Sequence, residues 1–463
     1  MTSLPPAFEE RMKTILKEEA GAFFQALQTP PPVSIRLNPE KPMDFPSEDT
    51  PLPADQVAWC EDGIYLNERP IFTLNPCFHG GAFYVQEASS MFLHHVLKQI
   101  LPPHPVRALD LCAAPGGKST LMASLLPEGS LLLANEVIRS RASILRENVI
   151  KWGRADVIVS NNDPSDFQNL EGAFDLVLVD APCSGEGMFR KDPKAISEWS
   201  EANLKLCSER QKRILSDIWD SLKPGGFLIY STCTYNPGEN EAILEWITEE
   251  LEGTSIKIEH SFNTITPATS KAFGYHFYPH KTRGEGFFIG VMQKQEGTER
   301  TIRKNKKQNK AKPMPIPQAL SSLLGHPEQF TAYVRENQIG FVPAAHYDFI
   351  GELENQLRVI YKGCEAIEMN NKKIKYLHPL ALFSGLERTQ CARYETDLNT
   401  ALTYLKKEDI PTAGQNGEWL LLTHHNIALG WGKNLGNRLN NYYPKEWRIR
   451  MRLDAESSPL IEE

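Results

Sequence analysis

The chain has few cysteines for its length, and they show no pattern that is typical of a structural framework. Eight cysteines lie in 463 residues, none of them in a Cys-x-x-Cys pair, and no Cys/His cluster has the spacing of zinc ligands. Disulfide-stapled domains are short and cysteine-dense, and zinc sites need closely spaced ligands. The sequence therefore predicts free thiols and no metal site. In a reducing compartment such a thiol is by default a small buried apolar side chain.

Long apolar runs and a surplus of positive charge are also missing. No stretch reaches the roughly 18 apolar residues that cross a membrane, and residues 1–24 mix acids and bases instead of carrying the apolar core of a signal peptide. We therefore expect a cytoplasmic protein without a membrane partner. The net charge of −8 does not indicate a nucleic-acid-binding protein. Phosphate binding needs only a local basic surface, so an RNA partner stays open.

The length of the chain predicts two to four domains. An amphipathic helix over residues 7–27, a proline-rich stretch and short strands favour an appended α+β module over residues 1–100. The expected regions that follow are 101–295, the main domain; 296–317, a linker; 318–385, an intermediate subdomain; and 386–463, a β-rich terminal domain.

The linker and the terminal domain have distinct compositions. Residues 296–317 carry seven Lys/Arg and almost no large apolar side chain before Met314, which favours a solvated tether over an RNA-contacting segment. The terminal domain ends in IALGWGKNLGNRLNNYYPKEWRIRM, where basic and aromatic residues alternate. That mixture suits stacking and phosphate contact, and it equally suits a surface strand pair that closes a small barrel.

Strands and helices alternate through the main domain. Apolar strands are expected at 106–111, 130–137, 155–161, 174–182 and 227–234, with a late strand at 285–293. Helices lie between them, and one places Ile138, Ala142, Leu145 and Val149 on a single face. The sequence KPGG, residues 223–226, predicts a turn before the fifth strand, and a helix is expected to begin near Pro237 after it. Such βαβ repetition predicts an open, doubly wound, Rossmann-like parallel sheet.

Ligands of such sheets bind beyond the carboxyl ends of the strands. The first strand runs into DLCAAPGGKST, whose glycines let backbone approach a ligand. A phosphate-binding P-loop would need glycine where Cys112 stands, which argues against a nucleotide hydrolase, and the dinucleotide pattern G-x-G-x-x-G is absent. A nucleoside-type cofactor held without a pyrophosphate remains.

Acidic residues follow the next two strands. Glu136 could accept hydrogen bonds from both ribose hydroxyls of an adenosine, and Asp163 could accept one from its adenine amino group. One acid at a strand end means little, but successive ones favour a site for ribose without phosphate. S-adenosylmethionine has that shape.

Two cysteines stand at the ends of the fourth and fifth strands, in Asp180-Ala-Pro-Cys183 and Ser231-Thr-Cys233-Thr. Two core cysteines would explain the residue type, but the flanking Asp, Pro, Gly and Ser are typical of a ligand-facing edge. Beside a methyl donor, a thiolate that adds to C6 of cytosine would make C5 nucleophilic. Asp180 would stabilise the adduct. The residues themselves do not show which thiol attacks.

Several segments, in order, resemble one family. These are SIRLN, GAFYVQEASSM, CAAPGGKST, NEVIRSRASILRENVIKWG, DAPCSGEGMFRKDP, YSTCTYNPGENE and YPHKTRGEGFFIG. They resemble the Sun-type (nucleolar-protein) RNA 5-cytosine methyltransferases. The total length and GWGKNLGNRLNNYYPKEWRIR resemble the bacterial ribosomal RNA small subunit methyltransferase F group, whose tail carries a PUA-like RNA-binding domain.

The resemblance implies a reaction and a division of labour. It implies S-adenosylmethionine-dependent formation of 5-methylcytosine in RNA, with Cys233 as the nucleophile and Cys183 assisting breakdown of the adduct. The implied cofactor contacts are Cys112, Ala113, Ala114, Pro115, Gly116, Gly117, Lys118, Glu136, Asp163 and Asp180. Small-subunit ribosomal RNA is the expected substrate and a monomer the expected state. The same chemistry on large-subunit RNA or transfer RNA, or a non-catalytic assembly factor, are the alternatives.

Overall fold

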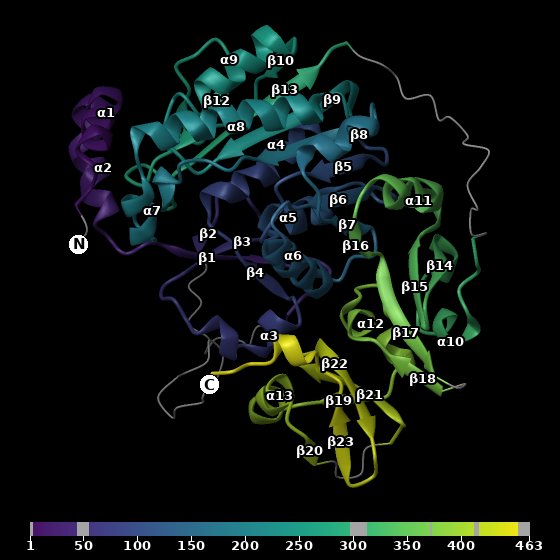
Figure 1. Cartoon of the computed structure of the whole chain (residues 1–463). Helices are drawn as coiled ribbons and strands as arrows, with labels where there is room; N and C mark the ends of the chain where they lie inside the picture. Colours follow the sequence, from purple (N-terminus) through teal and green to yellow (C-terminus); the bar gives the residue numbers. More distant parts are fainter. Residues whose placement is uncertain (1–2, 44–54, 297–312, 371–372, 412–415, 452–463) are drawn as a thin grey trace.

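A ten-stranded sheet forms the centre of the structure, a computed structural model that describes residues 3–43, 55–296, 313–370, 373–411 and 416–451 (Figure 1). The strand order is β11-β12-β13-β9-β8-β5-β6-β7-β16, and β10 pairs with β13. Five neighbours run parallel: β5 (Arg107–Asp110), β6 (Leu131–Asn135), β7 (Val157–Ser160), β8 (Phe174–Asp180) and β9 (Leu222–Thr232). The remaining strands are antiparallel: β10 (Gly253–Ile256), β11 (Thr266–Pro267), β12 (Gly274–Phe277), β13 (Phe287–Lys294) and β16 (Val359–Lys362).

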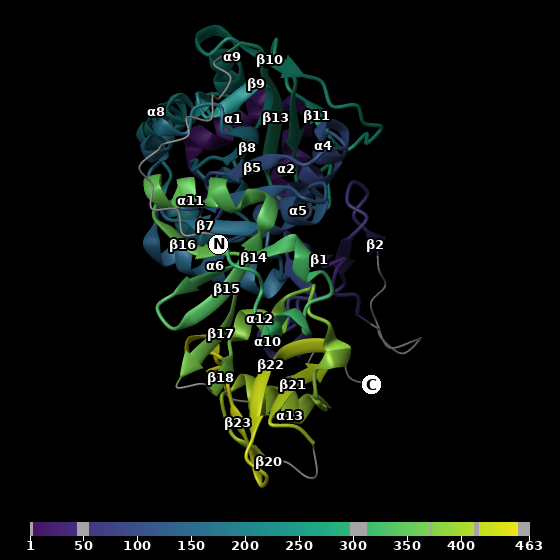
Figure 2. The same ribbon diagram turned by 90° about the vertical axis from the view of Figure 1, so that its right-hand side faces the viewer.

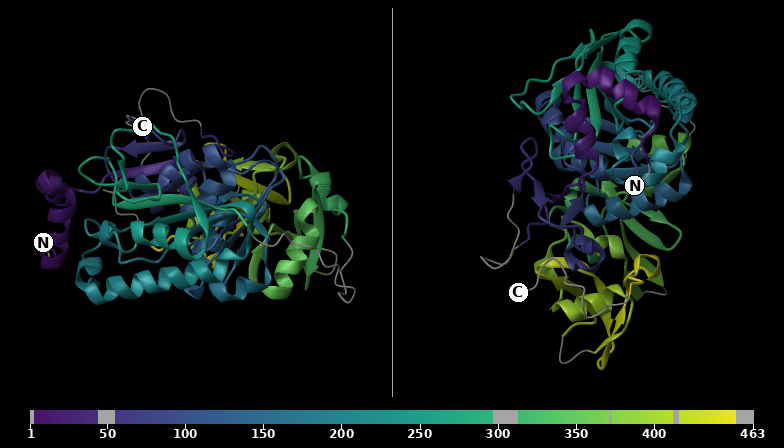
Figure 3. Two further views of the ribbon diagram at one scale, coloured as in Figure 1. Left: turned by 90° about the horizontal axis from the view of Figure 1, so that it is seen from above. Right: turned by 90° about the vertical axis from the view of Figure 1, so that its left-hand side faces the viewer.

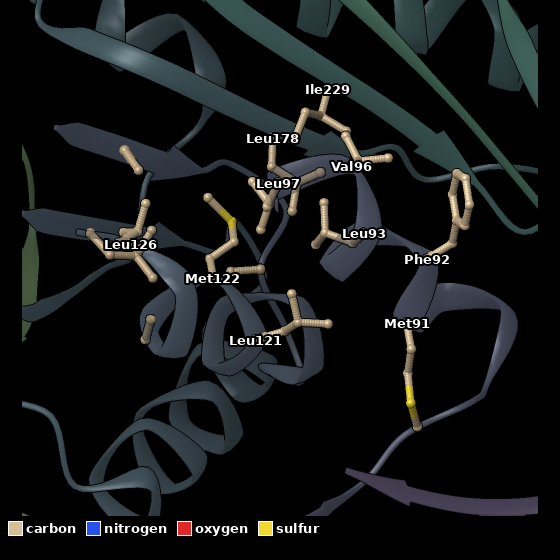
Figure 4. Packing of buried hydrophobic residues seen from close by; sticks show 14 of the residues in the cluster. Met91, Phe92, Leu93, Val96, Leu97, Leu121, Met122, Leu126, Leu178 and Ile229 are labelled. Atoms are coloured by element: carbon tan, nitrogen blue, oxygen red, sulfur yellow. The ribbon is translucent and has the colours of Figure 1, made fainter. Parts of the chain in front are cut away.

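Helices cover both faces of this sheet, as the doubly wound pattern predicts. One layer holds α4 (Phe92–Ile100), α5 (Gly117–Leu125) and α6 (Arg139–Trp152), and the other holds α8 (Glu201–Trp219), α9 (Glu241–Glu250) and α11 (Tyr347–Gln356). Successive strand residues alternate between the layers: Leu178 packs with the first, and Val177 and Val179 with the second. Because each strand is covered twice, its sequence is apolar throughout. Figure 4 shows Val96 and Leu97 of α4 beside Leu178 and Ile229.

Three element boundaries differ from the sequence-based expectation. The helix expected near Pro237 begins at Glu241, after a turn over residues 237–240. Lys223–Gly226 is not a separate turn before the fifth strand but a bulge within β9, since Leu222 and Phe227 pair with Phe174 and Leu176 of β8. Of the predicted α6 face, Ala142, Leu145 and Val149 are buried, whereas Ile138 precedes the helix and is 49% exposed.

The N-terminal module is a second, four-stranded sheet of order β2-β3-β1-β4. Its strands are β1 (Val33–Leu37), β2 (Asp55–Gln56), β3 (Gly63–Leu66) and β4 (Phe83–Val85), and α3 (Pro76–His79) precedes β4. The single helix expected over 7–27 is two helices, α1 (Pro6–Leu16) and α2 (Ala20–Leu27), because Lys17 has a φ of 51°. Both lie at the edge of the molecule beside α7 (Pro193–Glu198), where Phe8 and Phe23 pack against Tyr235 (Figures 1 and 3).

Residues 318–385, expected as a separate subdomain, are joined to the central sheet. They contain the sheet β14-β15-β17-β18, whose strands are β14 (Phe330–Arg335), β15 (Gln338–Pro343), β17 (Cys364–Asn370) and β18 (Lys373–Tyr376). The same segment supplies α11 and edge strand β16, which pairs antiparallel with β7. Its other helices are α10 (Gln318–Ser321) and α12 (His378–Leu382). Residues 297–312 of the expected linker lie outside the described residues.

The terminal region has a five-stranded sheet of order β19-β21-β22-β23-β20 and helix α13 (Leu398–Leu405). Its strands are β19 (Arg393–Glu395), β20 (Ile410–Pro411), β21 (Trp419–His424), β22 (Ile427–Asn434) and β23 (Arg438–Asn441). Figure 2 shows this region at the end of the molecule opposite the central sheet, with the segment 313–385 between them. Among the described helices, none is long and apolar enough to cross a membrane.

Candidate active site

Two thiols meet beyond the carboxyl ends of β8 and β9. These strands are parallel neighbours, and Asp180 lies opposite Ser231, so the chain segments that follow them run side by side. The Sγ atoms of Cys183 and Cys233 are 3.3 Å apart. The sequence-based expectation that both thiols face one site agrees with this geometry.

The surroundings of the two thiols differ. A hydrogen bond to Cys233 and burial raise the pKa of Cys183 well above its usual range. The hydrogen bond from Cys183 lowers the pKa of Cys233, and the positive charge of Lys118 acts in the same direction against burial and Asp180. The hydrogen bond between the sulfurs thus separates the two pKa values, and the charge of Lys118 adds to the lowering of the pKa of Cys233.

Asp180 connects that ammonium to the end of β9. Its Oδ2 lies 2.8 Å from Nζ of Lys118, and its Oδ1 accepts a hydrogen bond of 2.7 Å from Oγ of Ser231. Burial lowers the pKa of Lys118, but the charges of Asp180 and Cys233 outweigh burial and raise it overall. A carboxylate and an ammonium thus stand in contact at the strand ends, close enough to Cys233 to influence its charge.

A buried carboxylate, Glu239, holds the two cysteine loops together. It accepts hydrogen bonds from the backbone N–H and the Oγ of Ser184 at 2.9 and 2.5 Å, and from Nε2 of Gln211 at 3.0 Å. Nδ2 of Asn236 lies 3.3 Å from its Oε1. Ser184 follows Cys183, and Asn236 lies three residues after Cys233, just before the turn over residues 237–240. Glu239 therefore fixes the position of one thiol relative to the other.

A cavity of about 180 Å³ adjoins Asp180. Its lining joins two regions of the chain, residues 84–90 and the glycine-rich loop, and includes Tyr84, Gln86, Glu87, Ser90, Asp110, Cys112, Ala113, Ala114, Pro115, Gly117, Lys118 and Asp180. Asp110 is fully buried, and burial raises its pKa to about 7. Its Oδ2 accepts a 2.6 Å hydrogen bond from Ser119, whereas Oδ1 has no partner among the described residues. The cavity thus contains a buried acceptor with unused capacity.

The glycine-rich loop is held rigidly around this cavity. Gly116 has a φ of 117°, a backbone conformation that residues other than glycine rarely adopt. Arg141 and Asn148 of α6 donate to the carbonyls of Ala114 and Pro115 at 2.7 and 2.8 Å. Burial raises the pKa of Cys112, so this thiol stays neutral. The loop thereby presents backbone and small side chains to the cavity.

Glu136 and Asp163 lie at the ends of β6 and β7, outside that lining. Glu136 is buried, and its Oε1 accepts a hydrogen bond of 2.9 Å from the backbone N–H of Ile138. Asp163 caps a 3-10 helix and is 3.2 Å from Arg213. Although burial raises the pKa of Asp163, hydrogen bonds from Ser165 and the charge of Arg213 lower it overall. Contacts within the protein therefore use part of the hydrogen-bonding capacity of each acid.

Four residues of this region were not singled out by the sequence: Arg36, Asp110, Ser231 and Glu239. Arg36, in the SIRLN segment, is buried and donates to Gln86 and Thr120 at 2.7 Å each, so it ties the N-terminal module to α5. The sequence did contain a signal for Asp110, because an acidic residue at the end of an apolar strand is a candidate for ligand binding. The pairing of Glu239 with Ser184 carries no sequence signal, because 55 residues separate them. Within the described residues, no group of three or more His, Cys, Asp or Glu side chains is arranged to hold a metal ion.

Comparison with known families agrees with this arrangement. Residues 98–293 match the family model of the "16S rRNA methyltransferase RsmB/F", residues 4–88 that of the "N-terminal domain of 16S rRNA methyltransferase RsmF", and residues 391–449 that of the "Methyltransferase RsmF PUA domain". The Rossmann-like sheet with an N-terminal module and a PUA-type terminal domain, expected from the sequence, is thereby confirmed.

Relatives and solved structures extend the match. The ribosomal RNA small subunit methyltransferase F of Vibrio cholerae serotype O1 (strain M66-2) is 32% identical, covering 96% of this chain and 97% of the relative. The protein of the same name from Enterobacter sp. (strain 638) is 29% identical over 96% and 95%. A methyltransferase homolog protein from Pyrococcus horikoshii superposes with a TM-score of 0.52 at 28% identity, over 62% of this chain and 94% of that one.

NSun6 from the same archaeon, crystallised with SFG, shows the same fold at a TM-score of 0.51 and 20% identity, over 63% and 98% of the two chains. The family resemblance of the sequence is confirmed by the near full-length match at 32% identity. The chain belongs to the ribosomal RNA small subunit methyltransferase F family.

Proposed function

We propose that this protein transfers a methyl group from S-adenosylmethionine to C5 of a cytosine in 16S ribosomal RNA. The observation that carries the proposal is the 3.3 Å contact between Cys183 and Cys233 beside the Lys118–Asp180 ion pair. One thiolate supplies a nucleophile and the neighbouring thiol a second acid–base group, which is the equipment that methylation of an unactivated ring carbon needs. The names of the relatives supply the substrate.

The residues at the strand ends fit an adenosyl sulfonium cofactor. Within the described part of the chain one buried oxygen of Asp110 has no partner, and Gly116 allows the backbone to approach a ligand closely. Glu136 and Asp163 stand at the next two strand ends, where the family pattern places the ribose and adenine contacts. The cofactor contacts of the proposal are therefore residues 112–118 with Glu136, Asp163 and Asp180. Bound S-adenosylmethionine supplies a methyl group on a sulfonium, which leaves as a neutral thioether.

In the proposed reaction Cys233 attacks and Cys183 completes turnover. The thiolate pair of Cys233 forms a bond to C6, and the ring electrons shift so that C5 becomes nucleophilic and takes the methyl group. Asp180 and Lys118 hydrogen-bond the polar edge of the base and balance the charge of the adduct. Once Cys233 is bound to C6 its charge no longer opposes ionisation of Cys183, so the Cys183 thiol releases its proton to solvent and the resulting thiolate takes the C5 proton. The electrons of that C–H bond restore the ring double bond, the S–C6 bond breaks, and Cys233 leaves as a thiolate.

The flanking regions supply RNA binding in this proposal. Family matches at 4–88 and 391–449 support assigning both the N-terminal module, residues 1–100, and the PUA-like region, residues 386–463, to the RNA substrate. Residues 101–295 carry the reaction, 296–317 link, and 318–385 support the central sheet. The proposal keeps the monomeric state and the cytoplasmic location expected from the sequence.

Transfer of tritiated methyl groups tests the proposal. Wild-type protein should label 16S ribosomal RNA taken from cells that lack the gene, and bisulfite sequencing should find 5-methylcytosine there. Cys233→Ala should reduce the rate more than about 10³-fold, because the nucleophile is gone. Cys391→Ala, in the terminal region, should retain activity as the matched control. RNA binding without methyl transfer by the wild type would instead identify a non-catalytic assembly factor, and labelling of 23S or transfer RNA alone would change the substrate.

A further inference from the structure

A basic groove of about 910 Å³ lies between the N-terminal module and the loop that carries Cys183. Four cations line it: Arg69, Arg190, Lys191 and Arg283. Glu68 is the acid of its described lining, so the groove is locally positive in a protein whose net charge is −8. A local surplus of cations in an acidic protein marks a surface for a polyanion.

We propose that this groove binds the phosphate backbone of the RNA strand next to the target cytosine. The inference rests on the proposed function and adds the position of the RNA strand. The target base must reach thiols that are only partly exposed, so it has to leave any helix and stack. The groove should therefore receive single-stranded RNA. The groove is also lined by Pro30–Pro32 and Val33, which offer rigid apolar surface to the bases.

The groove and the active site share one loop. The backbone N–H of Gly187 donates to the carbonyl of Cys233 at 2.8 Å, so the segment from Cys183 to Lys191 joins the thiols to the groove wall. At the other side, the backbone N–H of Glu285 donates to Glu87 at 2.8 Å, and Glu87 lines the cofactor cavity. The walls of the groove are therefore tied by backbone hydrogen bonds to the Cys233 segment and to Glu87 of the cofactor cavity, which is where the proposal places the RNA strand.

One groove cation is structural and three are available to phosphate. Arg190 is almost fully buried, with Nε 3.0 Å from Glu285 and Nη2 2.6 Å from the carbonyl of Gly284, so it builds the wall. Arg69 and Lys191 are exposed, and Nζ of Lys191 lies 3.6 Å from Glu285, the carboxylate that Arg190 already engages. Arg283 stacks 4.4 Å over the ring of Tyr65 and pairs with Asp55.

The pair between Arg283 and Asp55 is easily exchanged. The Asp55 side chain is 78% exposed, and surface ion pairs of this kind contribute little free energy. A phosphate can therefore take the place of Asp55 at low cost. Stacking on Tyr65 keeps the guanidinium in position for that contact.

Salt-dependent binding tests the groove. The probe is a fluorescein-labelled single-stranded segment of 16S ribosomal RNA, and fluorescence anisotropy measures its Kd over a range of salt concentrations. The variant Arg69→Ala/Lys191→Ala/Arg283→Ala should lower the slope of log Kd against log salt by about 2, since each single-strand phosphate contact contributes about 0.7. Its KM for RNA should rise at least about tenfold, while kcat at saturating RNA and the Kd for S-adenosylmethionine stay unchanged.

Matched variants keep this test decisive. Arg210→Ala/Lys271→Ala/Arg335→Ala removes the same charges from exposed positions outside the groove and should leave slope and KM unchanged. Arg69→Ala alone, at an exposed loop position, should lower the slope by about 0.7 and covers the case in which the triple variant folds poorly.

The possible failures are distinguishable. An unchanged slope and an unchanged KM in both groove variants would overturn the proposal that the groove binds RNA. A loss confined to assembled subunits, with normal binding of free RNA, would also overturn it and identify a ribosomal protein as the partner. The anisotropy assay does not depend on methyl transfer. If instead the proposed function were wrong, the wild type would label no RNA. The slopes of log Kd against log salt would still differ between wild type and groove variants as expected.

Discussion

The Sγ atoms of Cys183 and Cys233 lie 3.3 Å apart although 50 residues separate them in the chain. Two sulfurs at this distance cannot both be charged cheaply, so they share one proton. The hydrogen bond between them raises the pKa of Cys183 and lowers that of Cys233, and the charge of Lys118 also lowers the pKa of Cys233. Two identical side chains therefore hold different protonation states, which is how an attacking group and a proton-handling group can be adjacent.

Cys183→Ala should accumulate a covalent protein–RNA complex. Cys233 can still attack the base, but the group that serves in removal of the C5 proton is missing, so the adduct should break down slowly. We expect turnover to fall at least about 10²-fold. The complex should appear on a denaturing gel as a retarded protein band that carries labelled ribosomal RNA. The double variant Cys183→Ala/Cys233→Ala should show no such band. A variant Cys183→Ala that turns over normally would contradict the two-thiol scheme.

The reactivity of Cys233 should depend on its two neighbours. The thiolate is the reactive form, and both the hydrogen bond from Cys183 and the charge of Lys118 lower the pKa of Cys233. Removing either neighbour should raise that pKa and move the onset of alkylation by iodoacetamide to higher pH. Cys183→Ser keeps a donor and should move it less than Cys183→Ala.

Mass spectrometry of the Cys233 peptide across a pH series measures this onset. In the same digests Cys391 gives an internal reference, because burial raises its pKa to about 11 and it should react only at high pH. Identical profiles for wild type, Cys183→Ala and Lys118→Met would mean that neither neighbour sets the state of the nucleophile.

Glu239 should act as a positioning residue. Its carboxylate accepts three hydrogen bonds of 3.0 Å or less, from Ser184 and Gln211. Glu239→Ala removes the hydrogen-bond acceptor of the buried Ser184 N–H, whereas the Ser184 hydroxyl and the Gln211 amide keep Thr234 and the carbonyl of Pro182. Loss of such an acceptor costs about 1–3 kcal/mol. We expect kcat to fall about 10- to 100-fold with little change in the Kd for S-adenosylmethionine.

Diamide oxidation separates positioning from general damage. Diamide takes two electrons and two protons from the thiol pair, becomes a hydrazine and leaves a Cys183–Cys233 disulfide, at a rate that depends on how well the sulfurs are aligned. Glu239→Ala should form this disulfide more slowly than wild type. Ser184→Ala, which removes one donor and keeps the carboxylate, should lie in between. Equal rates in all three proteins would show that Glu239 does not hold the thiols.

Asp110 should make the stability of the ligand-free protein depend on pH. Burial raises its pKa to about 7 in the folded state, well above the value of an unfolded chain. The folded form therefore binds this proton more tightly, and the stability that it contributes is present at low pH and lost as pH rises toward about 7. Asp110→Asn removes this dependence.

Thermal unfolding of Asp110→Asn and wild type across pH measures the effect. The variant should gain about 2 kcal/mol relative to wild type between about pH 5 and about pH 8. Saturating S-adenosylmethionine should change the difference between the two proteins if the cofactor contacts this carboxyl. A constant difference across the whole pH range would mean that Asp110 is ionised in the folded protein.

Local patterns were sufficient for the strands and for the residues at their ends. Apolar runs followed by Asp180, Cys183 and Cys233 predict a site because parallel strands end at one edge of a sheet. The break at Lys17 was not predictable, since a helix-compatible sequence continues through it and packing against the sheet domain decides. Glu239 was missed for a related reason: its partners come from a loop distant in sequence.

The position of residues 318–385 was also not predictable, because their partners are distant in sequence. Composition separates them from the main domain, yet β16 extends the central sheet beyond β7 and α11 covers it. A strand of four residues, Val359–Lys362, has no signal that names its partner. Its position depends on contacts across the whole domain, among them the guanidinium of Arg107 4.1 Å over the ring of Phe349.

A chain shortened to residues 1–317 should therefore be much less stable than one shortened to 1–385. The shorter chain exposes the edge of β7 and the core beneath Phe349, Ile350 and Leu353, which are buried in the intact protein. Burial of side chains of this size contributes about 1.5–3 kcal/mol each, so the loss should exceed about 5 kcal/mol. An exposed strand edge also favours aggregation. Thermal unfolding and light scattering compare the two chains, and equal midpoints would show that the central sheet does not need β16 and α11.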